Sequence, residues 1–134
     1  MSEPPPPSSP LLLPTLVTVV YGATVAALWG VLSLAFDREV IDFLDAGPLL
    51  GPAMVAAACL TVWLLVLHTP RARSPWPRAL AAVILVPSSM LVVAAVGYGP
   101  VAVPHFALGP FVWVASALAG VTVLVTWAFT PRMP

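Results

Sequence analysis

The chain has 134 residues, of which 60% are hydrophobic and only 7% are charged, and its formal net charge at pH 7 is zero. A soluble domain is about 25% charged, and the ionised groups here are too few to cover the surface of a soluble protein of this size. The balanced charge also argues against a nucleic-acid-binding surface. The composition therefore predicts an integral membrane protein.

Four long apolar stretches contain none of the five arginines and none of the five acidic residues. A helix rises about 1.5 Å per residue, so about 20 residues cross a hydrocarbon core about 30 Å thick. The sequence therefore predicts transmembrane helices at about residues 15–36, 49–68, 79–98 and 107–129.

The apolar stretches favour helices over the strands of a membrane barrel. Barrel strands alternate apolar and polar residues, whereas residues 60–67 are almost continuously apolar. Connections of about 8–12 residues would make consecutive helices antiparallel neighbours. We expect an all-α, polytopic membrane protein in which residues 14–130 form an up-down-up-down bundle of four transmembrane helices.

The two ends of the chain are predicted to be tails. Residues 1–13 are rich in proline, which lacks an N–H and fixes φ, so this segment is expected to be a disordered cytoplasmic tail. It has no positive segment ahead of the first apolar stretch, which argues against a signal peptide. Residues 131–134 are expected to be a short cytoplasmic tail.

The arginines predict an orientation in the plasma membrane. The segment between the second and third stretches contains no acidic residue and three arginines, Arg71, Arg73 and Arg78. Basic residues in short loops stay in the cytoplasm, so both termini, with Arg132, are predicted to be cytoplasmic. The exception, Arg38, lies in an otherwise acidic outer segment.

Small residues recur every four positions in the first stretch, at Gly22, Ala26 and Gly30. This spacing places them on one helix face, where they let two helix backbones approach closely. Packing within the bundle is one interpretation. Contact with a second copy or with another membrane subunit is the other.

Pro87 interrupts the third stretch and is followed by Ser88 and Ser89. Proline removes one helical hydrogen bond, and serine hydroxyls can satisfy freed carbonyls. The interruption is either a packing kink or a hinge beside a polar path. Such a path, in a small oligomeric transporter or channel, would lie near Ser88, Ser89, Tyr98, Thr122 and Thr126.

The remaining reactive side chains do not form a recognisable site. Cys59 is alone, which excludes an internal disulfide. His68 and His105 are expected at opposite membrane faces and cannot share a metal. Carboxylates gather between the first two stretches, at Asp37, Glu39, Asp42 and Asp45. Their spacing resembles no calcium cage, so we predict no metal, cofactor or catalytic residue.

The second and fourth stretches have the same two residues near their start and are followed by the same three. Residues 47–48 and 109–110 are both Gly-Pro, while residues 69–71 and 130–132 are both Thr-Pro-Arg. Duplication of a helical hairpin and the frequent use of Gly and Pro at helix ends both explain this pattern.

Across its whole length the chain resembles the many small, uncharacterised four-helix membrane proteins of high-GC bacteria, a resemblance that implies no functional residue. The spans contain no ionisable residue of the kind that ion-coupled transporters keep in the membrane, and no common catalytic motif is present. We therefore expect a non-catalytic membrane component that acts through helix–helix contacts with itself or a partner in the lipid bilayer, and not an enzyme. The transporter or channel is the alternative.

Overall fold

The computed structural model describes residues 9–37, 47–69 and 73–130. Several predicted features lie outside these ranges: most of the proline-rich tail, the C-terminal tail, three of the five arginines and the acidic residues Glu39, Asp42 and Asp45.

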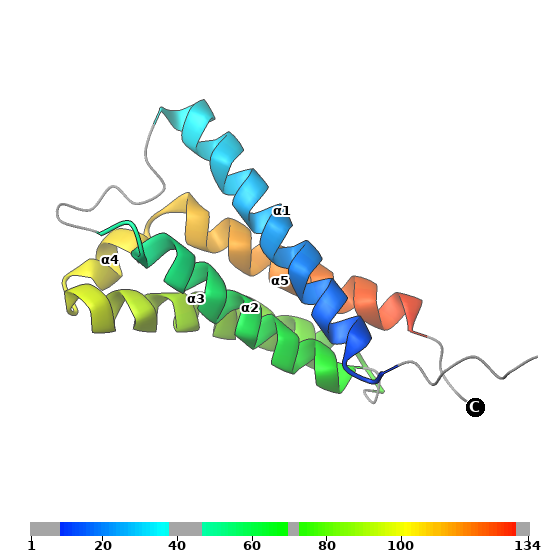
Figure 1. The fold of residues 1–134 in the computed structure, drawn as a ribbon. Coiled ribbons are helices and arrows are strands. Elements are labelled where there is room, and N and C mark those ends of the chain that lie inside the picture. The colour runs from blue at the N-terminus through cyan, green and yellow to red at the C-terminus, as the bar shows by residue number, and fades with distance from the viewer. Residues whose placement is uncertain (1–8, 38–46, 70–72, 131–134) are drawn as a thin grey trace, which may run out of the picture.

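The described residues form helices joined by turns (Figure 1). Their bounds are Leu12–Phe36 for α1, Leu50–His68 for α2, Trp76–Tyr98 for α3, Ala102–Ala107 for α4 and Pro110–Phe129 for α5. All but α4 are long and apolar enough to cross a membrane. The predicted all-α fold with four transmembrane helices is confirmed.

Two helices begin earlier than the composition predicted. α1 begins at Leu12, three residues before the predicted start, because Pro14 lies in its first turn, where a missing N–H costs nothing. α3 begins at Trp76, three residues early, and has Pro77 in its first turn for the same reason.

The segment between α3 and α5 differs from the prediction. Gly99, at φ 81°, ends α3 in a backbone conformation that favours glycine. The chain then forms α4, which the sequence had not predicted, and Ala107 belongs to α4 and not to the fourth membrane helix. That helix begins at Pro110 because Gly109, in an extended conformation, separates the two.

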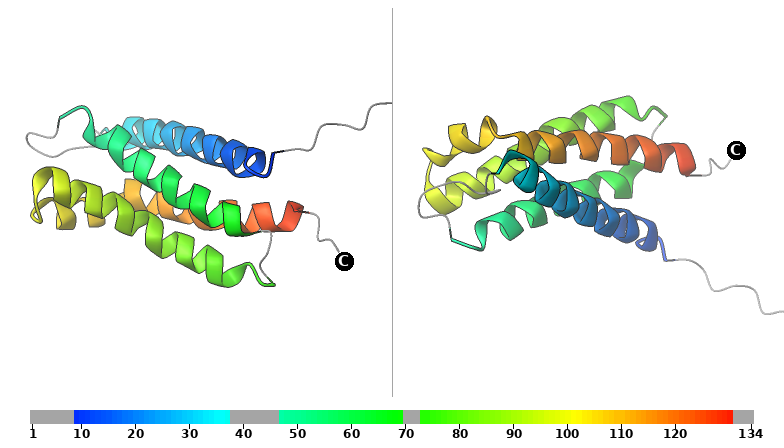
Figure 2. Two further views of the ribbon diagram at one scale, coloured as in Figure 1. Left: turned by 60° about the horizontal axis from the view of Figure 1, so that its bottom comes forward. Right: turned by 90° about the horizontal axis from the view of Figure 1, so that it is seen from above.

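The four long helices pack in a ring, with α1 against α2 and α5, and with α3 against the same two helices on the other side. Figure 2 shows α1 on one side of the assembly, over α2 and α5. Of the most apolar 18 residues of α1, only 17% are buried, against 33–39% in the other long helices. α1 is therefore the helix most exposed to its surroundings.

The interior of the assembly is apolar. Every long helix contributes fully buried aliphatic side chains, among them Val25, Val62, Val86, Met90 and Val123. The described polar side chains that are buried are Thr69, Ser116 and Thr126, and each hydroxyl donates to a backbone carbonyl. The core is thus held by close packing, and these three hydroxyls are paired. Within the described residues, Thr18 Oγ1 on α1 and Arg78 Nη1 on α3 are buried atoms without a hydrogen-bond partner.

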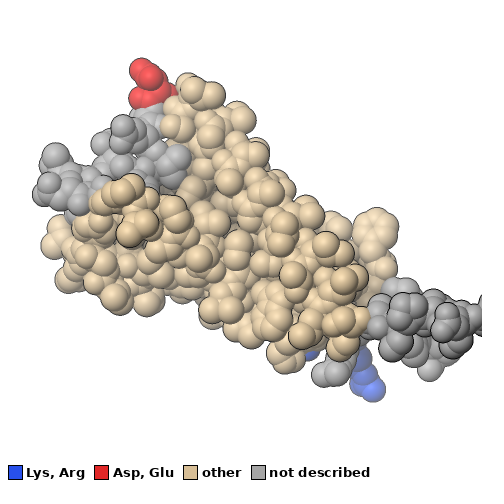
Figure 3. All heavy atoms as spheres, in the orientation of Figure 1, with Lys and Arg blue, Asp and Glu red and all other residues tan. Residues whose placement is uncertain are grey.

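The described charges separate to the two ends of the molecule (Figure 3). Asp37 follows the end of α1, whereas Arg73 precedes α3 and Arg78 lies in its first turn. We call these the Asp37 end and the arginine end. Between them, the described part of the four long helices exposes only uncharged side chains, as a lipid-facing surface requires.

Candidate functional site

α3 runs through Pro87 without ending, and the neighbouring helix compensates for the missing N–H. In a regular helix the N–H of residue 87 would donate to the carbonyl of Val83. Here the hydroxyl of Ser116 on α5 donates to that carbonyl at 2.6 Å. The buried Pro87 is therefore part of the α3–α5 contact.

The two serines after Pro87 bond within α3. Ser88 Oγ donates to the carbonyl of Ile84 at 2.7 Å, and Ser89 Oγ donates to that of Val86 at 2.8 Å. Ser88 is exposed on the outer surface of α3 and Ser89 is half-buried. Their hydroxyl protons are thus already donated to helix carbonyls.

Close approach of α3 and α5 continues one turn beyond Ser116. A Cβ atom placed on Gly120 would lie 2.8 Å from Val83 Cγ2 and 3.6 Å from the carbonyl oxygen of Ala79. Glycine therefore allows the two helices to meet at this level, next to the Ser116–Val83 hydrogen bond.

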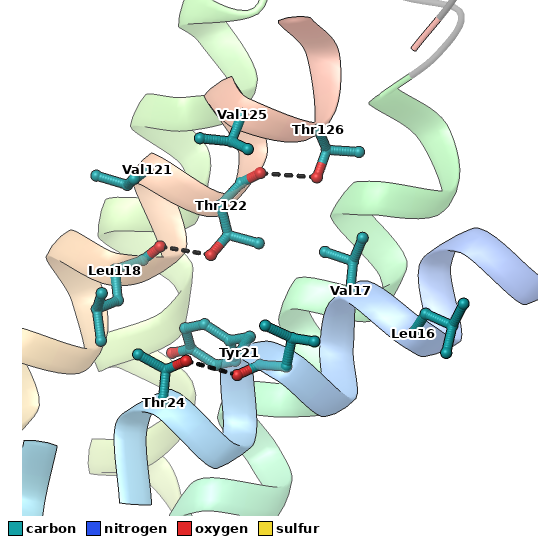
Figure 4. Close-up of a pocket in the computed structure, with 10 residues that line it drawn as sticks. Leu16, Val17, Tyr21, Thr24, Leu118, Val121, Thr122, Val125 and Thr126 are labelled. Atoms are coloured by element: carbon teal, nitrogen blue, oxygen red, sulfur yellow. Dashed lines mark hydrogen bonds between the residues drawn. The ribbon is translucent and has the colours of Figure 1, made fainter. Parts of the chain in front are cut away.

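A groove of about 380 Å³ runs between α1 and α5 in the half of the molecule near the arginine end (Figure 4). Its walls are aliphatic except for one tyrosine and three threonines. The lining residues are Leu16, Val17, Val20, Tyr21, Thr24, Leu118, Val121, Thr122, Val125 and Thr126.

The hydroxyls in this groove are all paired. Those of Thr24, Thr122 and Thr126 donate to carbonyls four residues earlier in their own helices, at 2.7–2.8 Å. Tyr21 Oη donates to the carbonyl of Ala115 at 2.9 Å and so ties α1 to α5. The groove consequently offers an apolar surface and little hydrogen-bonding capacity.

The residues predicted to line a transport path lie in separate places. Thr122 and Thr126 line the groove, whereas Ser88 is exposed on α3. Tyr98 ends α3, and its hydroxyl accepts a hydrogen bond from the backbone N–H of Gly47, ahead of α2. The structure does not join these residues into one polar path.

A second link ties α1 to α5 nearer the Asp37 end. Trp29 Nε1 donates to the carbonyl of Phe111 at 2.9 Å, and the two rings meet edge to face with centroids 6.1 Å apart. After Trp29, α1 is largely exposed: Val31 is 60% and Leu34 86% accessible.

The small residues predicted to share one face of α1 differ in what they contact. A Cβ on Gly22 would lie 2.9 Å from Cys59 Sγ, so Gly22 serves the contact between α1 and α2. Ala26 and Gly30 are exposed, and nothing lies within 4 Å of a Cβ placed on Gly30. Packing within the chain thus accounts for Gly22 alone.

The exposed part of this pattern includes two alanines that the four-residue spacing had missed. Ala23 and Ala27 are exposed and, at 100° per residue, lie on the same side of the helix as Ala26 and Gly30. We call these four residues the small face of α1. A search with spacings of both three and four would have found it.

The histidines and the cysteine remain apart. His68 Nδ1 lies 2.7 Å from the carbonyl oxygen of Leu64 in the last turn of α2, whereas His105 is in α4 and stacks edge to face on Phe106. Cys59 is a free thiol in α2. Within the described ranges, no three His, Cys, Asp or Glu side chains come close enough to hold a metal ion.

No curated protein and no solved structure matches the chain significantly. A family model described as "Family of unknown function (DUF6121)" matches residues 10–130, which cover all five helices. The chain therefore belongs to this family.

Proposed function

We propose that the protein is a non-catalytic component of the membrane that acts through helix–helix contacts, and that the small face of α1 is its contact surface. The observation that carries this proposal is the exposure of Ala23, Ala26, Ala27 and Gly30 on the helix that the rest of the chain covers least. Either a second copy of this chain or another membrane protein would meet this face.

The physical argument rests on how helices associate in lipid. Lipid tails are as apolar as leucine, so burial from water does not drive association, and close van der Waals packing between backbones has to do so. Small residues permit that approach. Exposed Leu16 and Leu34 lie on the same side of α1, before and after the small face, and would frame a helix that docks between them.

The interior supports a structural role over transport. A transporter needs a hydrated polar path across the membrane, whereas the described core is aliphatic and the hydroxyls of its buried residues Thr69, Ser116 and Thr126 donate to backbone carbonyls. Ser88, the hydroxyl nearest Pro87 on its C-terminal side, is on the outer surface. These features favour a protein that acts through contacts between its outer surface and other membrane helices.

We infer further that both termini are cytoplasmic and that the membrane is the bacterial plasma membrane. Arg73 and Arg78 lie at the end of the molecule where α1 begins and α5 ends. Arginines next to membrane helices favour the cytoplasmic side. The sequence adds Arg71 and Arg132 to the same side.

The proposal is tested with Ala27→Leu, which fills the small face, and Ala117→Leu as the matched control. Ala117 is an exposed alanine of α5 between Trp113 and Val121, which are large and exposed. The full chain is solubilised in a mild non-ionic detergent, and its mass and co-purifying chains are determined.

We expect wild-type protein and the Ala117→Leu variant to be recovered in a complex, and the Ala27→Leu variant to be recovered as a monomer. Recovery of wild-type protein only as a monomer, from detergent and from nanodiscs alike, would contradict the proposal. So would a complex that survives Ala27→Leu unchanged.

A further inference from the structure

Arg78 holds a buried donor that has no acceptor among the residues that the structure describes. The residue lies in the first turn of α3 and is half-buried, and its Nη1 atom is inaccessible and makes no hydrogen bond. A guanidinium stays protonated at any physiological pH. Nη1 is enclosed by protein atoms, so a partner from outside meets only the accessible part of this half-buried residue.

The described protein provides no counter-ion for this charge. The first turn of α3 contains no acidic residue, and Asp37, the acidic residue that the structure describes, is at the opposite end of the molecule (Figure 3). Arg73, five residues earlier in the chain and at the same end of the molecule, is exposed and adds a second positive charge. Along the sequence, Glu3 is the single acid in the segments on this side of the spans.

The position of Arg78 along the helix matches the level of the lipid headgroups. It lies two residues after Trp76, which begins α3 and is 64% exposed, and Phe129 at the end of α5 is 82% exposed. Exposed aromatic side chains next to a membrane helix gather at the boundary between hydrocarbon and water. Two residues of helix advance only about 3 Å, so the guanidinium lies close to that boundary.

We propose that Arg78, assisted by Arg73, binds the headgroup of an anionic phospholipid. A guanidinium presents parallel N–H donors that match two phosphate oxygens. An anionic lipid delivers the phosphate at the depth where Arg78 lies and brings a net negative charge to an end whose described charges are all positive. A zwitterionic lipid delivers the same phosphate together with an ammonium group, which the arginines repel.

The test compares lipids on the purified full-length chain in a non-ionic detergent. Phosphatidylglycerol or phosphatidylcholine is titrated in, and binding is followed by native mass spectrometry and by the shift in unfolding temperature. The variants are Arg78→Gln, Arg78→Lys and, as a matched loss of one arginine at a distant point of the sequence, Arg38→Gln.

We expect phosphatidylglycerol to bind more tightly than phosphatidylcholine and to raise the unfolding temperature more. A juxtamembrane arginine contributes about fivefold in affinity for an anionic surface, so Arg78→Gln should weaken phosphatidylglycerol binding by at least about that factor, while Arg38→Gln leaves it unchanged. Arg78→Lys should keep the preference for phosphatidylglycerol but bind it less tightly, since an ammonium is a single point charge.

Equal binding of the two lipids by wild-type protein would overturn the proposal, as would an Arg78→Gln variant with full affinity. If Arg78→Gln does not fold, Arg78→Lys provides the test. Phosphatidylglycerol binding as tight as that of wild-type protein would then overturn the proposal that two parallel N–H donors of the guanidinium hold the phosphate. Inorganic phosphate serves as a further arm: a stabilisation equal to that given by phosphatidylglycerol would identify a soluble phosphate site instead of a lipid site. None of these results depends on the small face of α1, so this proposal and the proposed function can fail separately.

Discussion

The hydroxyl of Ser116 on α5 donates to the carbonyl of Val83 on α3, the carbonyl that Pro87 leaves without its helical partner. The two deviations, a proline inside a membrane helix and a buried serine on its neighbour, therefore explain each other. Irregular backbone within a membrane is tolerated where a neighbouring helix pairs the freed group. This pairing favours packing over a hinge as the role of Pro87.

Ser116→Ala should destabilise the fold because it leaves the Val83 carbonyl unpaired inside the protein. Hydrogen bonds between membrane helices contribute about 0.6 kcal/mol on average and about 1.7 kcal/mol at most, and we expect a loss within this range. The measurement is the free energy of unfolding in mixed micelles.

Ser116→Ala should lower the free energy of unfolding by less when residue 87 has an N–H. Pro87→Ala lets α3 make its own bond to the Val83 carbonyl, so Ser116→Ala in that background should cost clearly less than in wild-type protein. An equal cost in both backgrounds would show that Ser116 and Pro87 are independent.

Gly120→Ala should destabilise the contact between α3 and α5, since the added Cβ would lie 2.8 Å from Val83 Cγ2. Overpacking typically costs about 1–3 kcal/mol, partly offset by about 1 kcal/mol of helix propensity. Val83→Ala removes the Cγ2 methyl group with which the added Cβ would clash. The double variant Gly120→Ala/Val83→Ala should therefore be more stable than Gly120→Ala alone.

Gly97→Ala provides the control for this comparison. A Cβ on Gly97 meets only Leu50 Cδ1, at an ordinary 3.9 Å, so the substitution should leave the unfolding free energy unchanged or raise it slightly. A loss at Gly97 as large as that at Gly120 would mean that glycine itself, and not the close approach, is responsible.

The sequence predicted the helices better than it predicted their contacts, and the reason is physical. A span of about 20 apolar residues without a charge has few alternatives in a bilayer, so the ranges near 49–68 and 79–98 agree closely with α2 and α3. The partner of Gly22 depends on how α1 is rotated against α2. The four-residue spacing of small residues indicates that they share a helix face, but it does not indicate which helix packs against that face.

α4 was missed for a related reason. Residues 102–107 are a short segment that includes Pro104, and six residues are too few to give a clear helical pattern. The bond from Ser116 to Val83 was beyond prediction as well, because it depends on the register between α3 and α5, and the two residues are 33 positions apart in the chain.

Tyr21→Phe should weaken the attachment of α1 to α5. The substitution keeps the buried ring and removes the hydroxyl that donates to the Ala115 carbonyl at 2.9 Å, so we expect a loss of about 0.6–1.7 kcal/mol in unfolding free energy. Thr24→Val is the control, because the hydroxyl of this exposed residue bonds within α1 at 2.8 Å. If the two variants lose equally, the hydroxyl of Tyr21 does not tie the helices together.

The proposed orientation predicts which positions a membrane-impermeant maleimide reaches from outside intact cells. Cys59 is the single native cysteine, so Asp42→Cys and Ser74→Cys are each made in a Cys59→Ala background. Ser74 is exposed beside Arg73 at the arginine end, and Asp42 belongs to the acidic segment that follows α1 in the sequence. Retention of arginines in the cytoplasm predicts that position 42 reacts at once and position 74 only after permeabilisation. Reaction at 74 but not at 42 in intact cells would invert the orientation and place both termini outside.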